Sequence, residues 1–132
     1  MRNIKFTYLY RDGGNYKNWD EVVFSNPDGL SPKEVISELR KAFTQDGLFI
    51  AHQVRLPEAF PYSDGDPTLD DHCFHEFGSI DPTAEAPNDR VGRSISNFLI
   101  EVTREASIGW RAFDPYDRLQ PIGKITAPWG QD

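Results

Sequence analysis

The sequence is poor in the features that mark secreted scaffolds and membrane proteins. Its 132 residues include one cysteine, Cys73, so no disulfide can form within the chain and a reducing, cytoplasmic location is expected. No apolar run approaches the roughly 20 residues that a membrane helix requires. The first residues lead directly into an alternating pattern, so neither a secretory signal nor membrane association is expected.

Positive charge is also scarce. The chain has 14 Lys and Arg residues against 21 Asp and Glu residues, a net charge of −7. A protein that binds nucleic acid generally needs a positive surface, so no direct nucleic-acid partner is expected. The excess lies in residues 58–90, which hold nine acidic residues, one arginine and four of the ten prolines. Proline and aspartate oppose helices and central strands, so we expect this segment to be mostly surface loop.

Motifs that usually accompany enzymes are missing. Neither of the common glycine-rich phosphate loops occurs, and we predict no cofactor and no metal. The run Gly92–Ser96 begins like a nucleophile elbow but ends in serine rather than glycine, and Ser94 is more simply explained as a helix N-cap.

Alternating apolar residues predict a pair of antiparallel strands at the start of the chain. Ile4–Tyr10 alternates with a period of two, as a strand with one buried face requires. Asp12–Asn15 contains Gly and Asn, which favour turns, and Trp19–Ser25 is expected to return as the second strand.

Two helices are predicted from their capping residues. Ser31 and Glu34 stand at the N-cap and N3 positions of a capping box, which predicts a helix over 32–45 with Gly47 as its C′ residue. A second helix is expected from Ser94 to Gly109, because apolar residues recur there with helical spacing.

Two further strands, over 48–54 and 71–78, complete the order β-β-α-β-β-α. This order predicts an α+β domain at residues 1–109, with a mainly antiparallel sheet and both helices on one face. Residues 110–132 combine aromatic residues with proline, which predicts an extended arm packed on its own domain or on a neighbouring subunit. We expect a homo-oligomer in which residues 110–129 contribute to the interface.

Aromatic and cationic residues gather around the first turn. Such a set can stack a base and hold the phosphate of a nucleotide-like anion, or it can contact a partner protein. An ordinary solvated hairpin is the simpler interpretation. The candidate binding residues are Tyr8, Arg11, Tyr16, Lys17 and Trp19.

A second polar cluster surrounds Cys73. Three ligand-type side chains would share one face of a strand, but their spacing of about 7 Å is too wide for all three to reach one metal ion. The simpler interpretation is that Cys73 packs inward while the histidines are hydrogen-bonded at the surface or at a sheet edge. The candidate residues are Asp70, Asp71, His72, His75 and Glu76.

Three functions remain open from the sequence. The first is a non-catalytic binding protein that acts through protein contacts, as an inhibitor or accessory factor, with the acidic segment addressing a basic partner. The second is a protein that binds or sequesters a small, nucleotide-like anion. The third is a small metal-dependent hydrolase that uses residues 70–76.

Overall fold

The computed structural model describes residues 2–12, 14–60 and 72–113. They form an α+β domain, as the sequence predicted, with the elements in approximately the predicted order. The elements are β1 (Asn3–Arg11), β2 (Lys17–Phe24), α1 (Pro32–Ala42), β3 (Leu48–Phe49), a 3-10 turn η1 (His52–Val54), β4 (His75–Thr83) and α2 (Ile95–Ile108).

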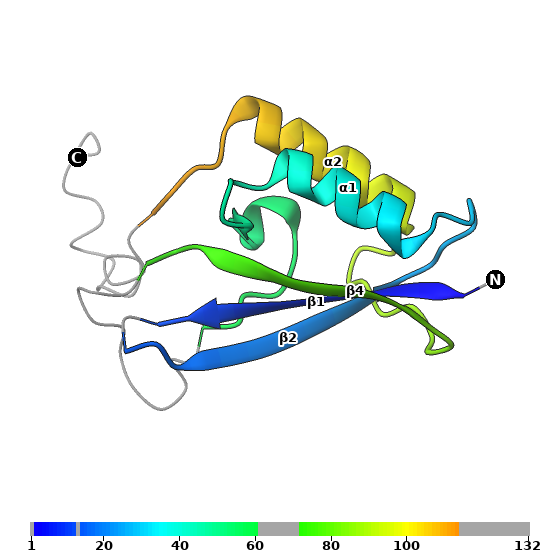
Figure 1. Cartoon of the computed structure of the whole chain (residues 1–132), viewed down its shortest axis with the longest axis horizontal. Coiled ribbons are helices and arrows are strands. Elements are labelled where there is room, and N and C mark those ends of the chain that lie inside the picture. Colours follow the sequence, from blue (N-terminus) through cyan, green and yellow to red (C-terminus); the bar gives the residue numbers. More distant parts are fainter. Residues whose placement is uncertain (1, 13, 61–71, 114–132) are drawn as a thin grey trace.

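The four strands form one antiparallel sheet in the order β2-β1-β4-β3. Helices α1 and α2 lie side by side over one face of the sheet (Figure 1). The buried face predicted for β1 is confirmed, since it consists of the buried side chains of Ile4, Phe6, Tyr8 and Tyr10. The Phe6 ring packs in the core against the rings of Phe43, Phe49 and Phe98, whose centres lie 5.6–6.4 Å away.

Helix α1 starts as predicted but ends earlier. The Ser31 hydroxyl accepts the N–H of Glu34 at 3.1 Å, and the Glu34 carboxylate accepts the N–H of Ser31 at 2.8 Å. The helix ends at Ala42 with Phe43 as its C-cap, so the predicted extent to 45 is wrong. Gly47 does have a positive φ of 77°, but in the turn that leads into β3.

Helix α2 has the predicted ends. The Ser94 hydroxyl accepts the N–H of Asn97 at 3.1 Å, and Gly109 is the C-cap with a φ of 119°. Residue 94 is therefore a structural cap, and its backbone forms a bridge with Ser25 at the end of β2.

The strand predicted over 48–54 is mostly wrong. Only Leu48 and Phe49 pair with β4, and His52–Val54 form the turn η1. The run is apolar because η1 packs beneath α2, where Ile50, Ala51 and Val54 are buried. A short buried turn and a short buried strand have the same apolar pattern, so composition alone does not separate them.

The strand predicted over 71–78 lies further along the chain, at His75–Thr83. Its second half contains Asp81 and Pro82, which are uncommon within sheets. They are tolerated because β3 pairs only with the start of β4, which leaves the remaining edge of β4 without a strand partner among the described residues. The register between β1 and β4 shifts at Thr7/Tyr8, where Gly78 is the extra residue.

The segment after β4 returns past the sheet to its opposite edge. Glu85 accepts the Asn3 side-chain amide through its carbonyl and forms an ion pair with Lys5 on the helix-free face. Asn88 then binds the edge of β2 at Val23. Its side-chain oxygen accepts the Val23 N–H at 2.8 Å, and its backbone N–H donates to the Val23 carbonyl at 2.9 Å. This segment closes the end of β2 that is nearest α2.

The first residues after α2 fold back on the domain. The Trp110 indole donates to the Ala42 carbonyl at 3.2 Å, and its ring lies 6.1 Å from that of Phe43. The rest of the predicted arm, beyond Phe113, lies outside the described residues, as does the interface predicted for it. No helix in the described ranges is long and apolar enough to cross a membrane.

Candidate functional site

The candidate residues around the first turn do not form one surface. Tyr8 is fully buried, and its hydroxyl donates to the Pro57 carbonyl at 2.5 Å, so its side chain lies in the core rather than at a binding face. Burial, together with the charge of Asp20, raises the pKa of this phenol well above its ordinary value. Tyr8 belongs to the core because it shares the inward face of β1 with Phe6.

Arg11 joins the two clusters that the sequence suggested separately. Its guanidinium binds the Glu76 carboxylate with distances of 2.8 and 3.3 Å, and it also donates to Asn15 at 2.7 Å. The His72 ring contacts the Arg11 carbonyl at 2.8 Å, and the His72 carbonyl accepts the Tyr10 hydroxyl at 2.7 Å. These contacts hold the end of β1 against the start of β4, which gives Arg11, His72 and Glu76 a structural role.

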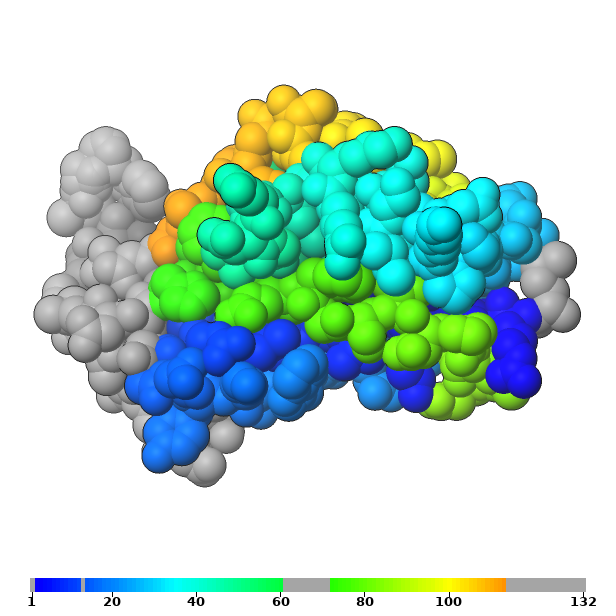
Figure 2. Space-filling view, viewed as in Figure 1, coloured from blue at the N-terminus to red at the C-terminus, as the bar shows by residue number. Residues whose placement is uncertain are grey.

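Tyr16, Lys17 and Trp19 are exposed. The side chain of Tyr16 is 77% accessible and that of Trp19 is 56% accessible. Trp19 is opposite Leu9 and lies on the helix-free face, where its ring approaches Gly78. Part of the hairpin surface, in blue, lies at the lower left margin of the molecule in Figure 2.

His75 is buried, contrary to the expectation that the histidines lie at the surface or at an edge. Its Nε2 accepts the Ala59 N–H at 2.9 Å, while Nδ1 has no hydrogen-bond partner. The rings of Tyr8, Tyr10 and Phe49 lie within about 6 Å. Burial lowers the pKa of His75 to about 4, so the ring is neutral at neutral pH.

Cys73 packs inward, as predicted, and its sulfur accepts the N–H of Phe113 at 3.3 Å. Asp70 and Asp71 lie outside the described residues. In the part of the chain that the structure describes, no three His, Cys, Asp or Glu side chains are arranged to hold one metal ion.

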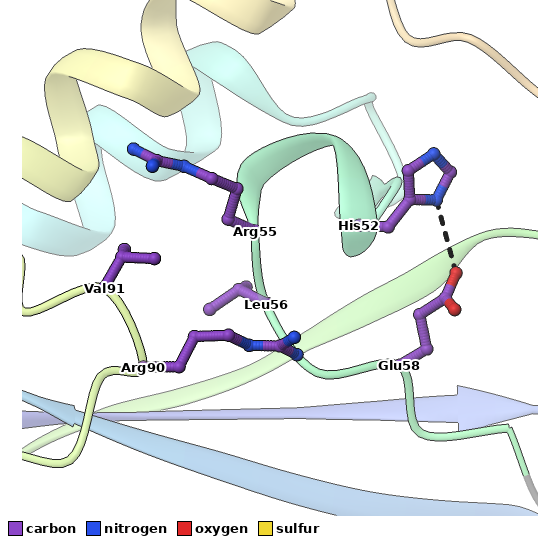
Figure 3. Close-up of a pocket in the computed structure, with 6 residues that line it drawn as sticks. All are labelled: His52, Arg55, Leu56, Glu58, Arg90 and Val91. Atoms are coloured by element: carbon purple, nitrogen blue, oxygen red, sulfur yellow. Dashed lines mark hydrogen bonds and ion pairs between the residues drawn. The ribbon is translucent and has the colours of Figure 1, made fainter.

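A pocket of about 310 Å³ forms between η1 and the loop before α2. One wall comes from His52 at the start of η1 and from the segment after η1, and the other comes from the loop before α2 (Figure 3). The volume lies at the lower end of the range for small-molecule sites. The lining residues are His52, Arg55, Leu56, Glu58, Arg90 and Val91.

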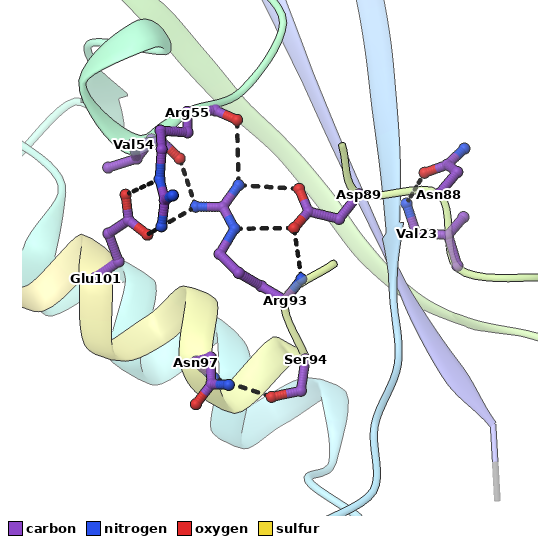
Figure 4. A network of polar contacts seen from close by, with 9 residues as sticks. All are labelled: Val23, Val54, Arg55, Asn88, Asp89, Arg93, Ser94, Asn97 and Glu101. Carbon is purple, nitrogen blue, oxygen red and sulfur yellow. Dashed lines mark hydrogen bonds and ion pairs between the residues drawn. The ribbon is translucent and has the colours of Figure 1, made fainter. Parts of the chain in front are cut away.

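A buried ion network supports this pocket from behind. The Arg93 guanidinium forms a two-bond contact with Asp89, both at 2.9 Å, and donates to Glu101 at 3.1 Å (Figure 4). It also donates to the carbonyls of Val54 and Arg55, at 2.6 and 3.2 Å. One side chain thus ties together the turn η1, the loop before α2 and α2 itself.

The network keeps its carboxylates ionised. Burial opposes the charge on Asp89 and on Glu101, but the hydrogen bonds and charges of the arginines outweigh it and lower the pKa of both groups. The Arg55 guanidinium binds Glu101 through Nε and Nη2, at 2.9 and 2.6 Å. Arg55 therefore has a fixed position at the border between the network and the pocket.

Arg90 is the cation of the pocket that remains available. Within the described ranges it forms neither a hydrogen bond nor an ion pair, and it is exposed. Its side chain lies across the pocket below Leu56 in Figure 3. Glu58, the carboxylate in the lining, contacts the His52 ring at 3.2 Å. Two arginines and an apolar floor therefore border a space that can accept an anionic group.

The sequence clusters missed this pocket. His52, Arg55 and Glu58 are far from Arg90 in sequence and come together only because Arg93 binds the carbonyls of η1. Arg55 adopts a left-handed conformation with a φ of 60°, which is uncommon for arginine. The signal available in the sequence was Asp89-Arg90 in the short segment before the predicted N-cap Ser94, and it does not specify a partner.

No family model, no curated protein and no solved structure matches this chain, so the arguments about its function rest on the geometry described above.

Proposed function

We propose that this protein is a non-catalytic binding protein that holds a small organic anion, a carboxylate or a phosphate monoester, in the pocket between η1 and the loop before α2. The observation that carries the proposal is the pair of arginines, Arg55 and Arg90, at the border of one pocket with an apolar floor. Guanidinium groups bind carboxylates and phosphates with good geometry, because their N–H groups form a rigid fork.

Preorganisation supports this proposal. The buried contacts of Arg93 fix the backbone at Val54 and Arg55, so the wall of the pocket is in place before a ligand arrives. A fixed wall reduces the entropy cost of binding. The Arg55 guanidinium still has Nη1 without a hydrogen bond among the described residues, and Arg90 has its whole guanidinium available.

The apolar part of the lining favours an organic anion over a bare ion. Leu56 and Val91 are the apolar residues of the lining, and Val91 is 42% exposed. A ligand with an apolar portion next to its anionic group would cover this surface. A nucleoside monophosphate has both an anionic phosphate and a flat, largely apolar base, and adenosine monophosphate serves as the reference probe.

The test is a thermal-shift and calorimetric titration with inorganic phosphate, acetate and adenosine monophosphate. We expect the nucleotide or the carboxylate to stabilise the protein, and we expect Arg90→Gln to weaken the binding about tenfold. Arg40→Gln, an exposed arginine on α1, is the matched control and should bind as the unchanged chain does. No shift with any probe, or an equal shift in Arg90→Gln, would contradict the proposal.

Protein contacts through the hairpin are a second candidate function, which would make the protein an inhibitor or accessory factor. The exposed rings of Tyr16 and Trp19 support it, because tyrosine and tryptophan contribute strongly to protein interfaces. A Tyr16→Ala chain that still binds the anion but no longer binds a purified partner would separate this function from the first.

A further inference from the structure

The edge of β2 is closed at one end and open at the other. The N–H and carbonyl of Val23 point away from β1, since both bind Asn88. Backbone groups repeat every two residues along a strand, so those of Lys17, Trp19 and Glu21 point to the same edge. Among the described residues these groups have one partner: the Glu21 N–H donates to the carboxylate of the adjacent Asp20 at 2.8 Å.

Among the described residues the Asp20 carboxylate is the one side chain that binds the open edge, and a pairing strand would displace it from the Glu21 N–H. Lys17, Trp19 and Glu21 stand on the helix-free face, where they are opposite Arg11, Leu9 and Thr7 of β1. The Trp19 ring is turned over the sheet toward Gly78 of β4, away from the edge. As far as the described residues show, the backbone at 17–21 is therefore accessible to a further strand, and all of its residues except the half-buried Asp20 are exposed.

We propose that β2 pairs antiparallel with β2 of a second copy of this chain, with the two-fold axis at Trp19. In this register the two Trp19 residues exchange backbone hydrogen bonds, and Lys17 of each copy lies opposite Glu21 of the other. Opposite charges directly across an antiparallel pair stabilise it. On the other face Asn18 lies opposite Asp20, so no like charges meet.

The charges select this register over its neighbours. The nearest registers that keep the outward backbone groups paired have the two-fold axis at Asn18 or at Asp20. An axis at Asp20 would place two carboxylates opposite each other, which is unfavourable, and an axis at Asn18 would place Lys17 opposite Trp19 and lose both Lys17–Glu21 pairs. A shift of a single residue would turn the outward backbone groups away from the partner. The segment at Asn88 prevents the pairing from sliding toward Val23.

A pairing over so few residues buries little surface, so the dimer is expected to be weak and concentration-dependent. The test measures the mass of the full chain by sedimentation equilibrium from about 10 to about 500 µM. We expect Lys17→Glu and Glu21→Lys each to weaken dimerisation at least tenfold, through like charges across the pair. The double variant, with Lys17→Glu and Glu21→Lys together, should restore it because the opposite charges meet again.

Lys33→Glu on α1 is the matched control, since it makes the same charge change at an exposed position away from β2. Circular dichroism establishes that each variant is folded. The proposal is overturned if the unchanged chain stays monomeric at the highest concentration, or if it dimerises and the single variants dimerise equally well. This dimer uses different residues from the anion pocket, so either proposal can fail without the other.

Discussion

Ser31 and Glu34 show how closely two side chains can define a helix start. Their reciprocal hydrogen bonds satisfy two backbone N–H groups that the helix itself leaves without partners. The bond from Ser31 also lowers the pKa of Glu34 below its ordinary value, because the ionised carboxylate is the better acceptor. The sequence predicts this helix start correctly because both residues of the capping box lie within four positions of the chain.

Replacing Ser31 with alanine is expected to lower the free energy of unfolding by about 1 kcal/mol through loss of the N-cap. Urea denaturation monitored by circular dichroism measures the change. Ser37→Ala, at an exposed position within α1, should be neutral or slightly stabilising, because alanine is the better helix former. Equal effects in the two variants would contradict the role assigned to the cap.

His75 gives the protein a specific dependence on pH. The folded chain holds this ring neutral down to a pKa of about 4, whereas the unfolded chain takes up a proton near 6.5. Between these values the unfolded state binds more protons, so stability rises with pH and falls as the pH is lowered through this window.

We expect the free energy of unfolding to drop by about 2 kcal/mol between pH 7.5 and pH 5 because of His75, a window that lies above the ordinary carboxylate pKa values. His75→Gln keeps an acceptor for the Ala59 N–H but does not titrate, so its curve should be flatter over this range. Denaturation at the two pH values measures both slopes. Parallel curves for the two proteins would contradict the assignment.

At the scale of elements, the packing around β4 is tighter than its sequence suggests. Gly78 is the extra residue of the bulge, and a Cβ there would lie 2.8 Å from the Thr7 carbonyl oxygen and 3.0 Å from the Trp19 ring. The first neighbour is backbone and cannot move without disturbing the pairing between β1 and β4.

Gly78→Ala is therefore expected to destabilise the protein by about 2 kcal/mol through overpacking. Thermal unfolding measures this change. Gly14→Ala is the control, since the nearest atom to its added Cβ would be at 3.4 Å, an ordinary contact distance. A stability equal to that of the unchanged chain would show that the sheet relaxes around the bulge.

Arg93 connects elements rather than single residues. Its loss would leave Asp89 without its buried partner and would free the carbonyls of η1. Arg93→Met should cost about 3 kcal/mol, since a buried carboxylate without a partner is strongly unfavourable. Arg104→Met, at an exposed position on α2, should change stability by less than about 0.5 kcal/mol. Similar costs in the two variants would contradict the role of the network.

The elements that the sequence predicted well are those with local signals. Both helix starts and the first two strands depend on neighbouring residues or on a simple alternation, and they lie close to where they were expected. The strand at 48–54 failed because burial beneath α2, not strand pairing, makes that run apolar. The end of β4 was predicted too early because Asp81 and Pro82 are uncommon within sheets, and they are tolerated here on an edge that has no strand partner among the described residues.

At the scale of the whole molecule, the candidate site could not be predicted from the sequence. Arg90 and Arg55 border one pocket only because the network at Arg93 joins two distant segments. Likewise, Tyr8 and Tyr16 were assigned to one cluster because they are close in sequence. In the structure the Tyr8 side chain is buried and the Tyr16 side chain is 77% exposed. The residue types of both clusters indicate what chemistry their side chains can perform, but the fold determines which of these side chains are accessible.

The residues after α2 provide a test of how the domain is completed. A chain that ends at Phe113 keeps the Trp110 contact with α1 and the bond from the Arg111 N–H to Gln53 at 2.9 Å, whereas a chain that ends at Gly109 loses both. We expect the shorter chain to be less stable by about 2 kcal/mol, mainly from the buried part of the indole and the hydrogen bonds of Trp110 and Arg111, since the bond from Phe113 to the Cys73 sulfur is a weak one. Equal melting temperatures would contradict this.

The two borders of the sheet differ in a way that bears on aggregation. β3 has two residues, and the edge of β4 beyond it, which has no strand partner among the described residues, carries Gly78, Asp81 and Pro82, which make a poor template for another strand. Growth by strand addition would need both borders to accept a neighbour. Of the two sheet edges that the described residues form, a pairing at β2 uses the one that can accept a strand, so it is self-limiting: it ends with two molecules and does not propagate into a fibre.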